Sequence, residues 1–184
     1  MLSIEKIERR ARQLLSDAKV TGPAVDVRAV AKFLRASIRP VEADENISGA
    51  IVREGDQITI GINSSHPITR KRFTIAHEIG HLVLHDAEAK VDHRYAQTPR
   101  DGIQLAALRS RVSSEAVDPR EIEANRFAAS LLMPVHYLEG SLHSYKLPLG
   151  DADIIRLARE YNVSVKAMNY RLMNLGVPVD VAGH

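Results

Sequence analysis

The clearest chemical pattern in the sequence is His77-Glu78-Ile79-Gly80-His81. On a helix, residues four positions apart lie on one face about one turn apart, so both imidazoles can reach one metal ion. Glu78 lies one position round the helix, where its carboxylate can accept a proton from a metal-bound water. In a zinc hydrolase the metal activates that water and polarises the scissile carbonyl. We therefore predict His77 and His81 as zinc ligands and Glu78 as the catalytic base.

A catalytic zinc ion usually has three protein ligands, so a third ligand must come from elsewhere. The chain has eight histidines and no cysteine, which excludes thiolate ligands and leaves imidazole or carboxylate. The best candidates lie in Glu121-Ile122-Glu123-Ala124-Asn125. Glu121 and Asn125 share a helix face, so Glu121 could bind zinc while Asn125 hydrogen-bonds a ligand histidine. Glu123 remains the alternative ligand, because periodicity does not decide between the two acids.

Other histidines and tyrosines could support the site. His85 lies one turn beyond His81 on roughly the same face. As a fourth ligand it would close the site and make it structural, and we favour a supporting role beside the ligands instead. An oxyanion would need a further donor, for which zinc peptidases often use a His or Tyr. The candidates are His93, His136, His143, Tyr95, Tyr137 and Tyr145.

Two amphipathic helices must carry these patterns. The spacing of apolar residues predicts one helix over residues 68–85 and another over residues 120–132, which Met133-Pro134 ends. Two further helices are expected near the N-terminus, one over residues 3–19 with Ser3 as its cap and one from Asp26 to about residue 34. Two more are expected over residues 151–160 and 165–174. A helical fragment at Ile103–Leu108 and a short segment at 135–143 complete the prediction.

Short segments rich in β-branched residues alternate with these helices. They predict strands over residues 36–40, 47–52 and 57–62, with Glu54-Gly55-Asp56 as a hairpin turn. We expect an α+β fold in which a small antiparallel sheet packs against the helices. The length suits one compact domain or one domain with a small appendage. We expect a catalytic domain over residues 1–146 with a C-terminal helical subdomain over 147–184 packed on it, or one domain over 1–184.

Charge and hydropathy restrict the partners. The 25 Lys and Arg residues nearly balance the 23 Asp and Glu residues, and the net charge of +2 is small for non-specific nucleic-acid binding. Charged residues interrupt the start of the chain, and no apolar stretch is long enough for a membrane span. We therefore expect a cytoplasmic protein with no membrane partner.

The two C-terminal helices and their short turn are also typical of a helix-turn-helix. A DNA-binding reading would use Lys166, Asn169 and Arg171, with Ser164 as the helix cap. The second helix carries few cations, whereas phosphate contacts normally dominate affinity for DNA. We favour a helical hairpin that packs on the catalytic core or docks a partner, and direct DNA binding is disfavoured.

Two blocks of the sequence resemble the ImmA/IrrE family of zinc metallopeptidases. They are RKRFTIAHEIGHLVLH at residues 70–85 and EIEANRFAASLLMP at residues 121–134. The family pairs an RF-x-x-AHE-x-GH block with an E-x-E-A-N-x-FA-x-x-LLMP block, and both occur here in order. The resemblance implies a zincin-like core with a gluzincin-like site. It selects Glu121 as the third ligand and Asn125 as the residue that orients a histidine, with Glu123 in reserve.

The resemblance also implies a function. Relatives similar to IrrE carry an additional C-terminal sensor-like domain, and at 184 residues we expect this chain to resemble the compact ImmA type. Proteins of that type are mobile-element or phage-encoded zinc endopeptidases that cleave a helix-turn-helix repressor and so regulate transcription. The alternatives are a non-catalytic protein that binds a repressor or antitoxin and, less favoured, a DNA-binding regulator.

Overall fold

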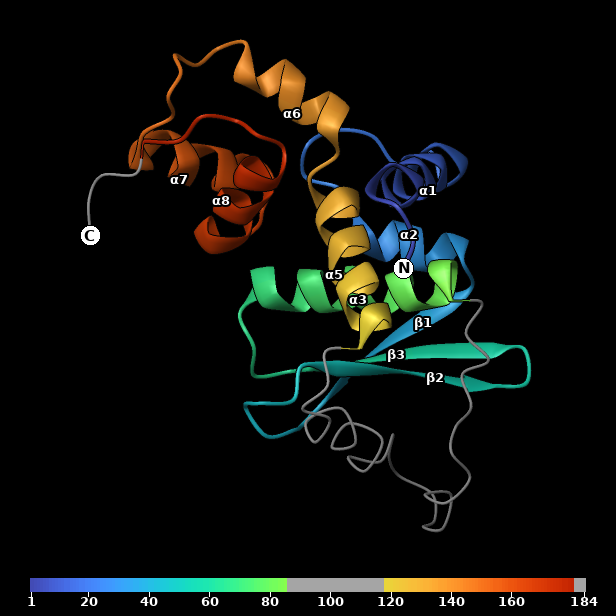
Figure 1. The fold of residues 1–184 in the computed structure, drawn as a ribbon. Helices are drawn as coiled ribbons and strands as arrows, with labels where there is room; N and C mark the ends of the chain where they lie inside the picture. Colours follow the sequence, from blue (N-terminus) through green and yellow to red (C-terminus); the bar gives the residue numbers. More distant parts are fainter. Residues whose placement is uncertain (86–117, 181–184) are drawn as a thin grey trace.

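A small sheet lies against one side of a layer of helices in the computed structural model, which describes residues 1–85 and 118–180 (Figure 1). The mixed composition of helices and strands confirms the predicted α+β class. The predicted helical fragment at Ile103–Leu108, together with His93 and Tyr95, lies outside the described residues.

The sheet has three strands in the order β1-β3-β2, with β1 at Ala36–Val41, β2 at Gly49–Glu54 and β3 at Gln57–Asn63. β2 and β3 form the predicted antiparallel hairpin, and Gly55 in its turn has a φ of +59°, which suits glycine. β1 pairs with β3 in parallel, so the prediction of an antiparallel sheet is wrong for this pair. β2 runs opposite to β1, and β3 runs opposite to β2, so β1 and β3 point in the same direction. Because β3 lies between the other two strands, it pairs directly with β1, and this pair is parallel.

Helix α3 (Ile68–Leu84) lies over the sheet, and α5 (Pro119–Leu132) crosses α3 (Figure 1). The bounds of both helices agree closely with the predicted ranges. At the start of α5 the Asp118 side chain accepts the backbone N–H of Arg120, and Pro119 occupies the first turn, where its missing N–H is not needed. The two motif-bearing helices are thus in direct contact.

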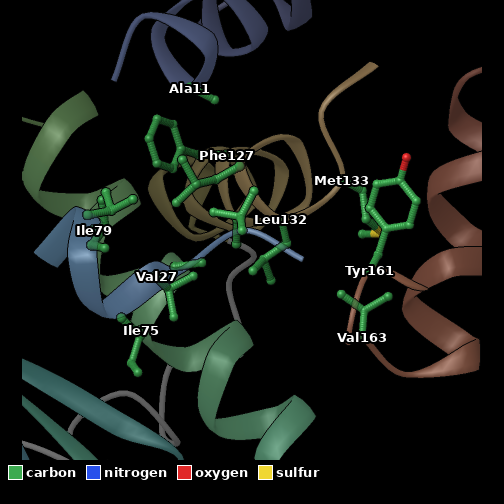
Figure 2. Packing of buried hydrophobic residues seen from close by; sticks show 14 of the residues in the cluster. Ala11, Val27, Ile75, Ile79, Phe127, Leu132, Met133, Tyr161 and Val163 are labelled. Atoms are coloured by element: carbon green, nitrogen blue, oxygen red, sulfur yellow. The ribbon is translucent and has the colours of Figure 1, made fainter. Parts of the chain in front are cut away.

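The N-terminal helices α1 (Ile4–Asp17) and α2 (Val27–Phe33) complete the helical layer. Both predicted caps are confirmed: Ser3 accepts the N–H of Lys6, and Asp26 accepts the N–H groups of Arg28 and Ala29. Figure 2 shows the apolar core between these elements, with Ile79 of α3 near Phe127 of α5 and Ile75 nearer to Val27 of α2.

Three further helices follow, α6 (Val135–Leu142), α7 (Asp151–Glu160) and α8 (Val165–Asn174). Their buried residues belong to the same hydrophobic cluster as those of α1, α3 and α5. Met133, after α5, and Tyr161, after α7, pack together (Figure 2). Burial of the Tyr161 phenol raises the pKa of Tyr161 to about 12. The core is therefore continuous across residue 147, and a division into two domains there stays a prediction.

None of the helices in residues 1–85 and 118–180 combines the length and the apolar character that crossing a bilayer requires.

Candidate metal centre

The two histidines of the motif face each other from successive turns of α3. His77 Nε2 lies 3.0 Å from His81 Nε2, and the rings meet edge to face with centroids 4.7 Å apart. His81 is buried and His77 is partly buried. The helix therefore holds the two imidazole nitrogens close to one point, as the four-residue spacing predicts.

Glu121 brings a carboxylate to the same point from the first turn of α5. Its Oε2 lies 3.1 Å from His77 Nε2, and its Oε1 lies 3.2 Å from His81 Nε2. Three ligands at tetrahedral angles, about 2.0–2.1 Å from a zinc ion, would be separated by about 3.3 Å. The spacing of the three donors therefore fits a metal ion of that size, and all candidate ligand atoms lie within 4.8 Å of one another.

Asn125 fixes the protonation pattern of His77. The Oδ1 atom of Asn125 lies 3.0 Å from His77 Nδ1, and a carbonyl oxygen can only accept, so Nδ1 must carry the hydrogen. The Nε2 atom is then left with a lone pair directed at Glu121 and His81. Electron-pair donors that converge in this way repel one another unless a proton or a metal cation lies between them.

Gly80 sets the distance between the two helices. A Cβ atom at this position would lie 3.1 Å from the carbonyl oxygen of Ala124, 3.2 Å from its Cα and 3.2 Å from the Phe127 ring. Ala124 is one turn after Glu121 on the same helix. The absence of a side chain at Gly80 thus lets α5 approach α3 closely enough for Glu121 to reach the histidines.

Replacing Gly80 by Ala is expected to weaken metal binding and to lower the free energy of unfolding by about 1–3 kcal/mol, because α5 must move away by a few tenths of an ångström. Competition with a chromophoric zinc chelator and denaturant unfolding would measure the two effects. Gly140→Ala in α6 is the matched control, since no atom lies within 4 Å of the added Cβ. Unchanged zinc affinity in Gly80→Ala would refute the role given to this contact.

A cleft of about 340 Å³ opens beside the three donors. Glu78 lines it and is 1% exposed, so its carboxylate is largely removed from bulk water. The remaining lining residues come from α3, from the start of α5 and from the segment that leads into β2. They are Asn46, Ile47, Ser48, Gly49, Arg70, Phe73, Thr74, His77, Glu121 and Asn125. The cleft thus joins an acid to the candidate ligands at a surface that a substrate can enter.

The structure places His85 and Glu123 in a separate contact. His85 Nε2 lies 2.8 Å from Oε2 of Glu123, and the other oxygen of Glu123 accepts the backbone N–H of Leu2. Burial acts to raise the pKa of Glu123, but the bonds from His85 and Leu2 outweigh it, so the pKa is lowered overall. Glu123 is therefore ionised, and its two oxygens bond His85 and Leu2 and not the three converging donors. The bond from His85 joins the end of α3 to α5.

The predicted oxyanion donors within the described residues do not meet the site. His136 and Tyr137 lie on α6 with their rings 4.1 Å apart, and His143 and Tyr145 follow that helix. Helix α6 begins after the end of α5 opposite to Glu121 (Figure 1), and none of the four lines the cleft.

Two of the three candidate DNA contacts are turned inward. Arg171 is 5% exposed, and its guanidinium donates to the carbonyl of Met133 and to both carboxylate oxygens of Glu8. The Oδ1 atom of Asn169 is buried, while Lys166 lies over the ring of Tyr170. Arg171 therefore joins α8 to α1 and does not present its charge to a phosphate.

Arg70 is the cleft residue that the motifs did not reveal. It precedes His77 by seven residues, which is about two helical turns, so the spacing places it on the face of the motif. The cleft wall at Asn46–Gly49 has no comparable signal, because its place beside α3 depends on the path of the chain between β1 and β2.

Comparisons with known proteins show the family and the fold of the chain. A solved structure named "Mycobacterium tuberculosis transcriptional regulator" is similar to 91% of this chain, with a TM-score of 0.60 and 16% sequence identity, which shows a shared fold. The chain spans 46% of that structure's chain, about half its length. A search of curated proteins finds no match. The family model described as the peptidase IrrE N-terminal-like domain matches residues 43–173, which include the cleft wall and both motif-bearing helices, and the chain belongs to this family.

Proposed function

We propose that this chain is a zinc-dependent endopeptidase of the cytoplasm that cleaves a regulatory protein. The observation that carries the proposal is the convergence of His77, His81 and Glu121 on one point beside the buried acid Glu78. Two imidazoles and one carboxylate are a donor set typical of catalytic zinc, and three protein ligands leave a position open for the reaction. The membership of the chain in a peptidase family agrees with this chemistry.

The chain's own residues provide the proton transfers. A zinc ion held by these donors would polarise the peptide carbonyl and lower the pKa of water. Glu78 accepts a proton from the attacking water as the water oxygen bonds to the carbonyl carbon. It then passes that proton to the leaving nitrogen as the carbon–nitrogen bond breaks. Asn125 keeps the Nε2 lone pair of His77 directed at the ligand position.

A polypeptide substrate fits the surroundings of the cleft. The cleft wall continues at Gly49 into β2, which pairs with β3 on one side and with no other strand of the described residues. The free edge of such a strand can add an extended peptide through backbone hydrogen bonds. We propose a helix-turn-helix repressor encoded by a neighbouring gene, as in mobile elements, as the substrate, and a structural relative named as a transcriptional regulator agrees with that setting.

The test is to incubate the purified protein with that neighbouring repressor, with added zinc and separately with a chelator, and to identify fragments by mass spectrometry. Cleavage at a defined bond that requires zinc is the expected result. A repressor that stays intact and bound after long incubation with the zinc-loaded protein would favour a non-catalytic binding protein instead. An intact repressor with no complex would reject this choice of partner.

A further inference from the structure

Arg70 places a positive charge in the lining of the cleft, about two helical turns before the candidate metal ligand His77. Seven residues along α3 separate it from His77, which corresponds to about 10 Å along the helix axis. An extended peptide advances about 3.3 Å per residue, so about three residues of substrate span this distance. Arg70 is exposed, and its side chain lines the same cleft as Glu78 and His77.

The guanidinium of Arg70 is held in place by the cleft wall. Its Nε and Nη2 atoms donate to the Ser48 hydroxyl at 3.2 and 3.0 Å, and Nη2 also donates to the Glu45 carbonyl at 3.3 Å. These bonds use one edge of the guanidinium. A side chain fixed in this way loses little further conformational freedom when it binds a ligand.

The wall that holds Arg70 is itself fixed by two buried side chains. The amide of Asn63, 1% exposed, donates to the carbonyls of Ala43, Asp44 and Ile47 at 2.9–3.1 Å. His66, 4% exposed, bonds the Glu45 carbonyl through Nε2 at 2.8 Å. The position of the Arg70 charge is therefore built into the fold and does not depend on the substrate.

The charge of Arg70 also lacks an acidic partner in the part of the chain that the structure describes. The bonds to Ser48 and Glu45 are to a hydroxyl and a carbonyl, and no carboxylate of the described residues lies within salt-bridge distance. The two N–H groups on Nη1 are in none of these bonds, and carboxylates are the ligands that a guanidinium binds best.

We propose that Arg70 is a specificity residue that selects substrates with an Asp or Glu side chain about three residues from the bond that is cleaved. This inference rests on the proposed endopeptidase function, because it concerns the choice of substrate. The subsite can nevertheless be measured by binding alone, so the two ideas can fail separately.

The binding experiment uses zinc-loaded protein with Glu78→Gln, so that peptides are not consumed. Two fluorescein-labelled pools of short peptides with amidated C-termini carry Asp or Asn at a central position, with Ala, Leu, Ser or Phe elsewhere. Fluorescence anisotropy should show that the Asp pool binds about tenfold more tightly than the Asn pool, because one charge-assisted hydrogen bond contributes about that much affinity. Adding Arg70→Gln should reduce this ratio to about one, and adding Arg70→Lys should restore part of it.

Lys71→Gln is the matched control, because Lys71 is the adjacent cation of α3 but lines a different hollow with Ile68 and Asn162. It should leave the preference for Asp unchanged. Equal affinity for the two pools in the protein that retains Arg70, or the same loss with Lys71→Gln, would overturn the proposal.

A cleavage experiment separates the subsite from the activity. Catalytically intact, zinc-loaded protein is given the unlabelled Asp pool, and the fragments are sequenced by mass spectrometry. Cuts should cluster about three residues from the Asp. Tight binding of the Asp pool without any cleavage would support the subsite and count against the peptidase activity. Cleavage without a preference for Asp would support the activity and reject the subsite.

Discussion

Zinc-loaded protein in which Glu78 is replaced by Gln is expected to retain its metal and to hydrolyse its substrate about 10²–10⁴-fold more slowly. Gln has nearly the same size as Glu but cannot accept the proton of the attacking water. Because Glu78 is 1% exposed and lines the cleft beside the candidate ligands, no bulk solvent is placed to substitute for it. The free energy of metal binding should change little, since Glu78 is not among the three converging donors.

Elemental analysis gives the zinc content, and the rate of fragment formation gives the activity. Glu139→Gln makes the same chemical change at an exposed position of α6 and should leave both quantities unaltered. Cleavage by Glu78→Gln at the rate of the unaltered protein would reject Glu78 as the base. Loss of zinc from this variant would instead place the Glu78 carboxylate among the ligands.

Glu121 and Glu123 are expected to respond in opposite ways to replacement by Ala. Loss of a residue that only hydrogen-bonds a metal ligand typically lowers metal affinity about 10–100-fold. Glu121→Ala removes one of the three donors themselves, so zinc affinity should fall by more than this. Glu121 is 37% exposed at its side chain, and the metal-free protein should unfold at nearly the same denaturant concentration as before. Glu123→Ala leaves all three donors in place.

Glu123→Ala should instead destabilise the metal-free fold by about 1–3 kcal/mol, because the Leu2 amide and the His85 ring lose a buried acceptor. Zinc affinity by chelator competition and unfolding by denaturant in the presence of EDTA give the two measurements. Should Glu123→Ala release zinc while Glu121→Ala retains it, the assignment of the third ligand would be reversed.

Local spacing predicted the histidine pair well, whereas the choice between the two acids needed the rotation of α5. Glu121 lies three residues before Ala124, and Glu123 lies four residues before Phe127. Ala124 and Phe127 are both buried, so both acids border the same buried stripe and have equivalent helical spacing to it. The rotation of α5 against α3 decides which of them meets the two motif histidines, and the short distance at Gly80 lets that acid reach them.

Contacts between distant segments explain the remaining differences between prediction and structure. The short β-branched segment at residues 36–40 predicted a strand, but no local signal shows that β3 lies between this strand and β2 and pairs with it in parallel. The bond from Leu2 to Glu123 likewise joins residues 121 positions apart. Helix caps, in contrast, depend on neighbouring residues, and Ser3, Asp26 and Ser164 were all predictable.

Because the candidate ligands come from two separate helices, a bound metal would be coupled to the whole fold. The His77–Glu121 pair joins α3 to α5, and α5 in turn packs on α1 and leads to the C-terminal helices. With zinc bound as proposed, each tenfold rise in free zinc above the dissociation constant would add about 1.4 kcal/mol to the free energy of unfolding. The amount of folded protein would then depend on the free zinc concentration around it.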